Sequence, residues 1–232
     1  MEGEFTSKGQ AAFFDTVDGT LPSNPIPVTK NNIARFNTML TTTPGLLSLN
    51  YKLMEDIEAS DLRTDLGTNN NWIAIGTGGA GNRFTGTFDG NNKTRTGLKI
   101  NTGNGHQGLF GYIDGATVQN VNLAAVNIVV TDNYVGGVIG ANNSANGDAI
   151  VQNCYATGNV SCTSGNNVGC VVGRNYIDIG SDSAIVQNCY STSSITGTGT
   201  KIGGVVGYAY WSPSGAVSVT SPPAVIIGLT NP

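Results

Sequence analysis

The sequence predicts an all-β protein folded as a parallel β-helix, a solenoid of about five coils with a short capping helix near its N-terminus. The first reason is an internal repeat. Ala-Ile-Val-Gln-Asn-Cys-Tyr at residues 149–155 returns unchanged at residues 184–190, with a looser copy at residues 116–121. The equivalent asparagines, Asn120, Asn153 and Asn188, are 33 and 35 residues apart. Repetition at a fixed period in this range is typical of solenoids and arrays.

Composition is the second reason. Charged residues make up 11% of the chain, and 33 of its 232 residues are glycine. Such a chain is poor helix material but suits short strands joined by turns. Hydrophobic residues reach 39%, enough to build a core. A 33-residue repeat is also short for the four antiparallel strands of a propeller blade, which favours one β-helix coil per repeat.

The first elements are a leader and a helix. Residues 1–28, broken by prolines, are expected to be an irregular leader or a segment added to the native chain. A single β-helix domain is then expected over residues 29–232. Residues 30–42 predict its capping helix, because Ile33, Phe36 and Leu40 fall on one helical face. Such a helix would cover the apolar interior and unpaired edge of the first coil.

From Leu47 onward, short apolar runs alternate with turn residues. The expected strands are residues 49–53, 72–75, 84–88, 94–100, 108–113, 118–123, 128–130, 135–139, 150–155, 168–172, 185–190, 202–206 and 224–227. The expected turns carry Asp89-Gly90, Asp114-Gly115, Asn142-Asn143, Asn146-Gly147 and residues 165–167. Glycine, asparagine and aspartate tolerate the positive φ that such turns require.

Stacking the repeats predicts the role of each repeated residue. Val118, Val151 and Val186 should point into the core, and the glutamines that follow them should point outward. The three asparagines should lie at a bend and form a ladder of side-chain amides between coils. The glycines at 140, 173 and 207 should mark a corner where no Cβ fits.

The four cysteines leave two interpretations open. Cys154 and Cys189 occupy equivalent repeat positions, so they are either a stack of small buried residues or a disulfide. Cys162 and Cys170 face the same choice across a loop. With one histidine in the chain, His106, a Cys/His zinc cluster is nearly excluded.

The chain is similar to the GLUG-motif proteins of bacterial surfaces. The similarity begins near Lys30 and rests on residues 51–57, 72–76, 84–91, 97–100 and 108–113, followed by the Gly-Gly-Val-Val-Gly and Gln-Asn-Cys-Tyr copies. It implies a right-handed parallel β-helix in secreted or surface-anchored proteins, including regions beside immunoglobulin A peptidases and haemagglutinin-like adhesins. It implies no catalytic or binding residues. Thr94-Arg95-Thr96 departs from the family pattern, which has an apolar residue there, and predicts a looser coil.

Charge argues against several partners. The net charge is −4 and the 11 basic residues are scattered singly, so no basic stripe is available to nucleic acid. The same pattern disfavours an anionic polysaccharide or an acidic membrane. No apolar run is long enough for membrane insertion. The composition suggests a secreted or cell-surface location, with signal and anchor absent from this segment.

Three groups of residues are weighed as sites. The acids Glu55, Asp56, Glu58, Asp61 and Asp65 are expected to form a solvated loop, with calcium binding and paired-acid catalysis as alternatives. Asp89 and Asp114 are expected to be turn aspartates, and His106 a surface residue. Tyr208, Tyr210 and Trp211 are the candidate ligand surface, in an aromatic set that includes Tyr134, Tyr155, Tyr176 and Tyr190.

These observations favour a non-catalytic β-helical module of a secreted or cell-surface bacterial protein, without a cofactor. It would act as a stalk or as an adhesive surface for a host or matrix molecule or glycan, beside neighbouring domains of a larger protein. One alternative is a polysaccharide hydrolase or lyase. The other is an ice-binding solenoid, suggested by Thr192, Thr196, Thr198 and Thr200.

Overall fold

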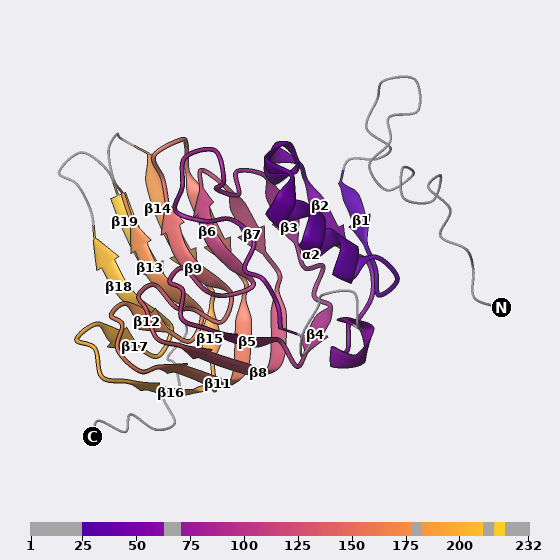
Figure 1. Cartoon of the computed structure of the whole chain (residues 1–232). Helices are drawn as coiled ribbons and strands as arrows, with labels where there is room; N and C mark the ends of the chain where they lie inside the picture. The colour runs from indigo at the N-terminus through magenta and orange to yellow at the C-terminus, as the bar shows by residue number, and fades with distance from the viewer. Residues whose placement is uncertain (1–24, 63–70, 178–181, 211–215, 221–232) are drawn as a thin grey trace.

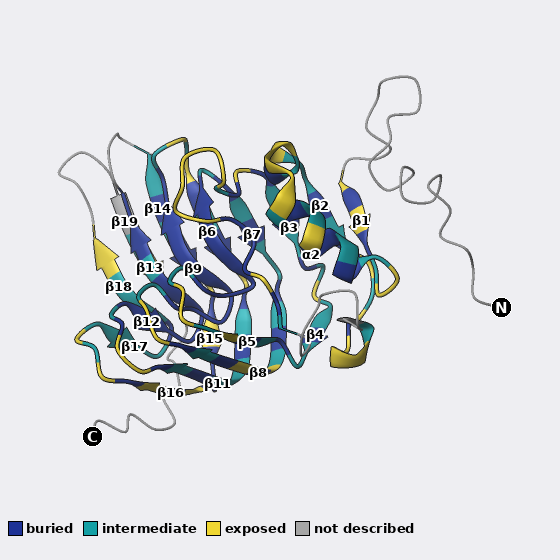
Figure 2. Ribbon diagram, in the orientation of Figure 1, coloured by how far each residue is buried: buried dark blue, intermediate teal, exposed yellow. Residues whose placement is uncertain are grey.

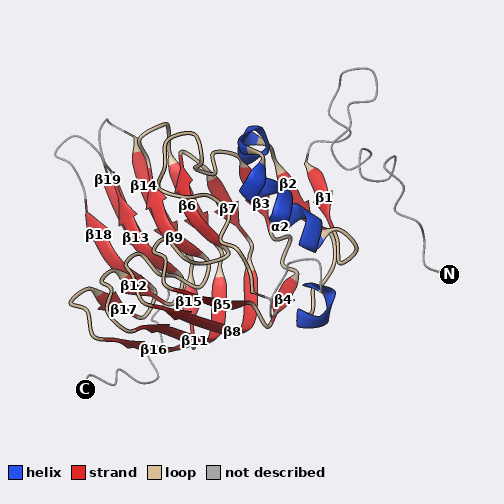
Figure 3. Cartoon of the chain, in the orientation of Figure 1, coloured by secondary structure: helices blue, strands red, loops and turns tan. Residues whose placement is uncertain are grey.

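A computed structural model describes residues 25–62, 71–177, 182–210 and 216–220 of the chain. The described residues form a parallel β-solenoid of about five turns with a helix near the N-terminus, which confirms the expected fold class. The helical elements α2 (Ile33–Thr42), η1 (Pro44–Ser48) and η2 (Ala59–Leu62) gather at one end of the solenoid (Figure 3).

The strands form three lateral sheets that run along the solenoid, and the coils from β3 to β18 contribute to all three (Figure 1). The first sheet, in spatial order, contains β1 (Ile26–Val28), β2 (Tyr51–Leu53), β3 (Thr87–Asp89), β7 (Thr117–Gln119), β10 (Ala149–Gln152), β14 (Ser183–Gln187) and β19 (Ala216–Thr220). The second contains β4 (Thr94–Thr96), β5 (Lys99–Thr102), β8 (Asn122–Val130), β11 (Tyr155–Cys162), β15 (Tyr190–Ser191) and β16 (Ser194–Gly197). The third contains β6 (Phe110–Asp114), β9 (Ile139–Asn143), β13 (Val172–Tyr176) and β18 (Val206–Tyr210), and a short pair, β12 (Val168–Gly169) and β17 (Ile202–Gly203), lies at a corner.

The pairing register follows the sequence repeat. Val118 pairs with Val151 and Val151 with Val186, all in parallel strands. The three valines are fully buried, whereas the glutamines that follow them are half-buried, as the alternation predicts. One core of buried hydrophobic residues extends from Ile26 to Val205. Figure 2 shows buried residues on the strands of successive coils. Burying each such valine is worth about 1.5–3 kcal/mol, so in-register stacking of identical residues stabilises this register over a slipped one.

The capping helix packs through the face predicted for it. Ile33, Phe36 and Leu40 are buried, and the Phe36 ring lies 5.0 Å from that of Tyr51 and 6.0 Å from that of Phe88. Asn37, also buried, donates from Nδ2 to the Ile73 carbonyl and accepts from the Ile73 N–H. The helix is thus held by apolar contacts and by a backbone-like pair of hydrogen bonds to the next coil.

The structure corrects several boundaries. Ile26–Val28 form β1 against β2, so the expected leader ends earlier than residue 28; residues 1–24 lie outside the described part. Residues 72–75 form only an isolated bridge, between Ile75 and Phe110. The sequence interpretation missed β19, and the strand expected at 224–227 lies outside the described residues. Asn142-Asn143, expected in a turn, lies in β9.

The asparagine ladder is confirmed. Asn153 Nδ2 donates to Asn120 Oδ1 at 3.0 Å, and Asn188 Nδ2 donates to Asn153 Oδ1 at 3.3 Å. All three asparagines have φ between 52° and 55°, which places them at the expected bend. Asn120 Nδ2 donates in turn to Asp89, so the ladder extends one coil further than the sequence repeat suggested. A parallel ladder joins Gln119, Gln152 and Gln187, which was not predicted.

Replacing Asn153 with alanine should lower the free energy of unfolding by about 2 kcal/mol. Alanine loses both ladder bonds and must adopt a left-handed φ, which costs roughly 1–2 kcal/mol on its own. Asn153→Gly is the matched control, because it removes the same amide but accepts that φ. Urea denaturation should rank wild type above the glycine variant and the glycine variant above alanine. Equal stability of the two variants would contradict the backbone part of the argument.

The corner glycines are required by close approach. A Cβ on Gly140 would lie 2.5 Å from the Gly111 carbonyl oxygen, and one on Gly173 would lie 2.6 Å from that of Gly140. Contacts this close are essentially never made by a real Cβ, so the expected lack of space is confirmed. Gly140 and Gly173 lie inside β9 and β13, however, and not at the corner that the sequence predicted, because it is the chain at the neighbouring corner that approaches these strands. Because these glycines have no side chain, the chain segment at each preceding corner packs directly against the backbone of the third sheet at these positions.

The cysteines are free thiols in the described residues. Gln152 pairs with Gln187 and Tyr155 with Tyr190, so Cys154 and Cys189 stack on adjacent coils, and both are fully buried. Cys162 and Cys170 are also buried and unbonded to each other. Burial raises the pKa of the Cys154 thiol well above its ordinary value, which is typical of an unreactive core cysteine.

Candidate functional site

The predicted acidic cluster is not assembled into one site. Glu55 accepts from the Lys30 N–H, Asp56 from the Thr94 N–H and Asp61 from the Glu58 N–H. Each carboxylate therefore caps a different piece of backbone. Asp65 lies outside the described residues. Within the described part of the chain, no three His, Cys, Asp or Glu side chains are grouped so that they could hold a metal ion.

Of the two aspartates predicted to lie in turns, only Asp89 makes the local hydrogen bond of a turn residue. Its carboxylate accepts from the Asn91 N–H two residues on, as in an Asx turn. Asp114 is instead fully buried. It forms an ion pair with Arg83, 2.8 Å from Nη1, and accepts from the backbone N–H groups of Ala145 and Asn146 on the next coil.

His106 is packed between aromatic rings and is not the free surface residue that the sequence suggested. Its ring stacks on Tyr134 at 4.6 Å between centroids and lies 5.3 Å from the ring of Tyr112. Burial lowers the pKa of His106; Asp132 opposes this shift, whereas Arg174 and Arg83 add to it. The imidazole is therefore neutral at pH 7.

Acidification should destabilise the protein through His106. The pKa is lower in the folded than in the unfolded chain, so the unfolded state binds the proton first. Stability should be complete above about pH 7 and fall as the pH drops through the unfolded value of about 6.5. His106→Asn keeps a residue that tolerates the observed φ of 56° and should remove this component. Urea denaturation of wild type and His106→Asn at several pH values would measure this pH dependence. If the free energies of unfolding of the two proteins change equally with pH, the prediction is contradicted. His106 is the only histidine in the sequence.

The strongest candidate site is a lateral hollow of about 370 Å³, which we call the tyrosine groove. Its lining residues are Tyr134, Asn167, Arg174, Lys201, Tyr208 and Tyr210. The rings of Tyr208 and Tyr210 lie 6.2 Å apart and nearly parallel, with an interplanar angle of 19°. Two members of the predicted ligand surface thus form one wall; the third, Trp211, lies outside the described residues.

Register explains how residues from three coils come together. Val135 bridges to Val168, and Val168 pairs with Ile202, so the preceding residues Tyr134, Asn167 and Lys201 form a column at the corner. On β13 and β18, Arg174 pairs with Tyr208 and Tyr176 with Tyr210. The glycines of the third sheet have no side chains, so this second column, on β13 and β18, lies directly beside the first column at the corner. Tyr155 and Tyr190, 4.3 Å apart, are register partners on the second sheet and line no part of the groove.

The sequence interpretation missed Asn167, Arg174 and Lys201. A signal for two of them was present, because Tyr134, Asn167 and Lys201 each precede the Val-Gly or Ile-Gly pair that opens a repeat copy. Placing those residues in one column would have shown a tyrosine, an amide and a cation on neighbouring coils. Arg174 could have been found from its position two residues before Tyr176, which matches Tyr208 before Tyr210.

The groove contains two cations held against rings. The Arg174 guanidinium carbon lies 3.6 Å from the Tyr176 ring centroid and 5.4 Å from that of Tyr134. Lys201 Nζ lies 3.8 Å from the Tyr208 ring centroid. In the described part of the chain, neither cation forms an ion pair with a carboxylate. Arg174 Nε is buried and has no hydrogen-bond partner.

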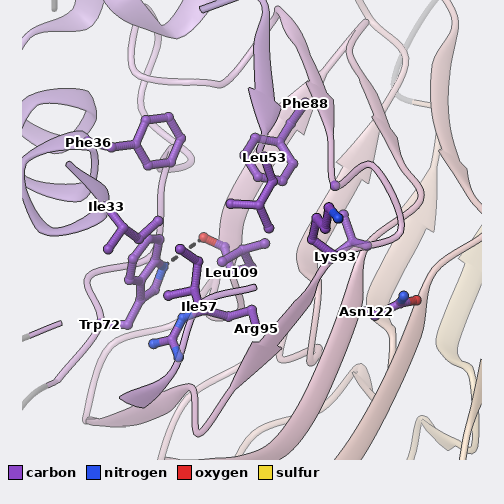
Figure 4. A pocket seen from close by; sticks show the side chains of 12 residues that line it. Ile33, Phe36, Leu53, Ile57, Trp72, Phe88, Lys93, Arg95, Leu109 and Asn122 are labelled. Atoms are coloured by element: carbon purple, nitrogen blue, oxygen red, sulfur yellow. Dashed lines mark hydrogen bonds between the residues drawn. The ribbon is translucent and has the colours of Figure 1, made fainter. Parts of the chain in front are cut away.

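Other hollows lie near the N-terminal end. A hollow of about 390 Å³ is lined by residues 71–74, Gly76, Thr77, Thr102 and residues 104–107. An interior apolar hollow of about 20 Å³ lies between α2 and the sheets (Figure 4). There Trp72 Nε1 donates to the Leu109 carbonyl, and Arg95 reaches under Trp72 with its guanidinium carbon 6.0 Å from the ring. The coil expected to be looser at Arg95 instead buries that side chain.

The threonines considered for ice binding do not form a repeated column. Thr192, Thr196, Thr198 and Thr200 are exposed. Thr196, however, pairs with Ser161, which pairs with Val129, so the position changes in each coil.

Two further observations concern membrane-spanning helices and similarity to known proteins. Among the described residues, no helix has the length and apolarity to cross a bilayer. Comparison of the chain with protein-family models, curated proteins and solved structures finds no match, so the similarity to GLUG-motif proteins stays a prediction.

Proposed function

We propose that this chain is a non-catalytic β-solenoid module of a secreted or cell-surface bacterial protein. It acts as a stalk and as an adhesive surface, and it contacts host or matrix glycans through the tyrosine groove. The observation that carries the proposal is the groove itself. Parallel tyrosine rings on a rigid parallel sheet offer flat faces for sugar rings, as in many small-ligand sites.

Backbone strain at the corner beside the tyrosine groove supports a functional role for this region. His106, Tyr134 and Asn167 all have positive φ, between 56° and 66°. Asparagine adopts this conformation readily, but tyrosine pays a steric cost for it. Residues in such strained conformations persist only where the surrounding structure holds them in place, and they cluster at functional sites.

The solenoid supports the same role in a second way. Its interior is filled continuously, and its strands pair in register from coil to coil. Arg174, Tyr208 and Tyr210 lie on β13 and β18, and side chains on strands are held more accurately than side chains on loops. Repeated coils also give a long lateral surface, which suits a stalk.

Glycan binding by the intact chain should depend on the groove tyrosines. On an array of neutral and acidic glycans, the Tyr208→Ala/Tyr210→Ala variant should bind roughly tenfold more weakly than wild type or worse, because each aromatic contact is worth about 0.5–1.5 kcal/mol beyond area burial. The matched control is Tyr155→Ala/Tyr190→Ala, which removes a stacked tyrosine pair from another face. The control should bind like wild type.

Three results would contradict the proposal. The first is equal loss of binding in both double variants, and the second is binding to no glycan at all. The third is release of shortened products from a polysaccharide substrate, which would favour the enzyme alternative. Thermal hysteresis in the same preparation would favour ice binding.

A further inference from the structure

The two cations of the tyrosine groove differ from the ion-paired cations of the described residues. Lys30 lies 4.0 Å from Glu55, Lys52 lies 3.6 Å from Asp89 and Arg83 lies 2.8 Å from Asp114. Arg174 and Lys201 have rings where those residues have carboxylates. Two positive charges on adjacent coils thus line one hollow without an internal counter-charge.

Their surroundings make an anion the best-matched ligand. The Arg174 guanidinium carbon lies over the Tyr176 ring, so the ring covers one face of this group and leaves its terminal N–H groups at the edge for a ligand. A carboxylate is the group whose geometry fits such an edge, through paired charge-assisted hydrogen bonds. Partial burial strengthens this attraction relative to open water.

Aromatic rings beside the cations specify the rest of the ligand. Tyr208 pairs with Arg174 across the coils, and the Lys201 ammonium lies over the Tyr208 ring. A ligand carboxylate held by the two cations would therefore lie in the same hollow as Tyr208 and Tyr210. A saturated sugar ring can lay its C–H face on such a wall, with its hydroxyl groups directed to solvent and to Asn167.

The overall charge limits how many negative groups the ligand carries. The chain has a net charge of −4, so a long polyanion that extended beyond the groove would meet repulsion. At physiological ionic strength the attraction of the two cations is screened beyond about 8 Å, so they do not draw in charges far from the groove. A single negative charge fits this pattern better than a chain of them.

We propose that the tyrosine groove binds a glycan carrying one carboxylated sugar, with Arg174 and Lys201 holding the carboxylate and Tyr208 and Tyr210 supporting the ring. This inference rests on the proposed glycan-contact function and names its ligand class. It distinguishes an acidic sugar unit from the long anionic polysaccharides that the scattered basic residues disfavour.

The test is calorimetric titration of the full chain with sialyllactose, its carboxyl methyl ester and lactose, and with glucuronic acid and galacturonic acid disaccharides beside their methyl esters. At least one free acid should bind roughly ten- to a hundredfold more tightly than its own ester, since a hydrogen bond to a charged group is worth about 1.5–3 kcal/mol. Arg174→Gln and Lys201→Gln should each weaken the binding of that acid by about tenfold or more. Arg174→Lys should weaken its binding less than Arg174→Gln does. Lys93→Gln, the same charge change outside the groove, should have no effect, and unchanged thermal unfolding would confirm that the variants are folded.

The other outcomes separate the two proposals. If acids and esters bind equally and only Tyr208→Ala/Tyr210→Ala weakens them, the acidic-sugar inference is overturned and the glycan-contact function survives. If no glycan binds, both are overturned. A short glutamate peptide that binds as tightly, with the same dependence on Arg174, would replace the sugar by a peptide. Tighter binding of heparin than of any single-acid sugar would overturn the preference for one charge.

Discussion

Replacing Asp114 with alanine should lower the free energy of unfolding by about 3–4 kcal/mol, the largest effect that the structure predicts. The carboxylate is fully buried and receives hydrogen bonds from Arg83, from the Ala145 and Asn146 N–H groups, and from the Asn146 amide at 2.6 Å. Removing it leaves a guanidinium without its carboxylate and two backbone donors without acceptors. Breaking a buried pair on one side costs about 3–5 kcal/mol, and the partial exposure of Arg83 places this case at the lower end.

A double-mutant cycle would separate the ion pair from the loop contacts. Arg83→Ala, Asp114→Ala and the double variant should show coupling of about 1–2 kcal/mol, with the remaining loss belonging to the 144–146 segment. The pKa of Arg83 is raised chiefly by its hydrogen bond to Asp114, consistent with that coupling. Asp132→Ala is the control, because that carboxylate is exposed and accepts from its own neighbour, Asn133. A loss below 1 kcal/mol at Asp114 would show that water replaces the carboxylate.

Replacing Arg95 with methionine should raise the free energy of unfolding by about 2 kcal/mol. Arg95 is 3% exposed, and although Nη1 donates to the Thr96 carbonyl, Nε and Nη2 have no hydrogen-bond partner among the described residues. Burial lowers the pKa of Arg95 to about 10, with Asp61 and Glu58 opposing the shift. Because the folded pKa is lower than the unfolded one, this charge penalises folding at every pH below about 10. Methionine occupies similar space beside an apolar hollow and carries no donor to satisfy.

The control for Arg95 is Lys93→Met, which removes one positive charge from the same coil. Lys93 is only half-buried, so its loss should change stability by less than about 0.5 kcal/mol. Urea denaturation of both variants at neutral pH would check the difference. If Arg95→Met is less stable than wild type, the Trp72 ring and the carboxylates of Asp61 and Glu58 hold the cation more favourably than its unpaired donors suggest.

The sequence by itself determined the architecture. Identical residues recurring every 33–35 positions specify parallel, in-register stacking, since only this register buries every copy of the valine and places every copy of the asparagine at a bend. The capping helix also followed from local spacing, because Ile33, Phe36 and Leu40 share a face whatever they pack against. These features depend on short-range periodicity, which a single sequence displays directly.

Tertiary structure decided the features that depend on contacts between coils. Arg174, Lys201 and Tyr134 form one groove because three coils stack in register and glycine columns allow close approach, and none of the three is a neighbour of another in the sequence. The burial of Asp114 and Arg95 likewise depends on which segments cover them, and a turn aspartate or a strand arginine has the same local sequence whether it is covered or exposed. Period and propensity thus specify which way a residue points, whereas the partner it meets there is set by chain segments about 30 residues away.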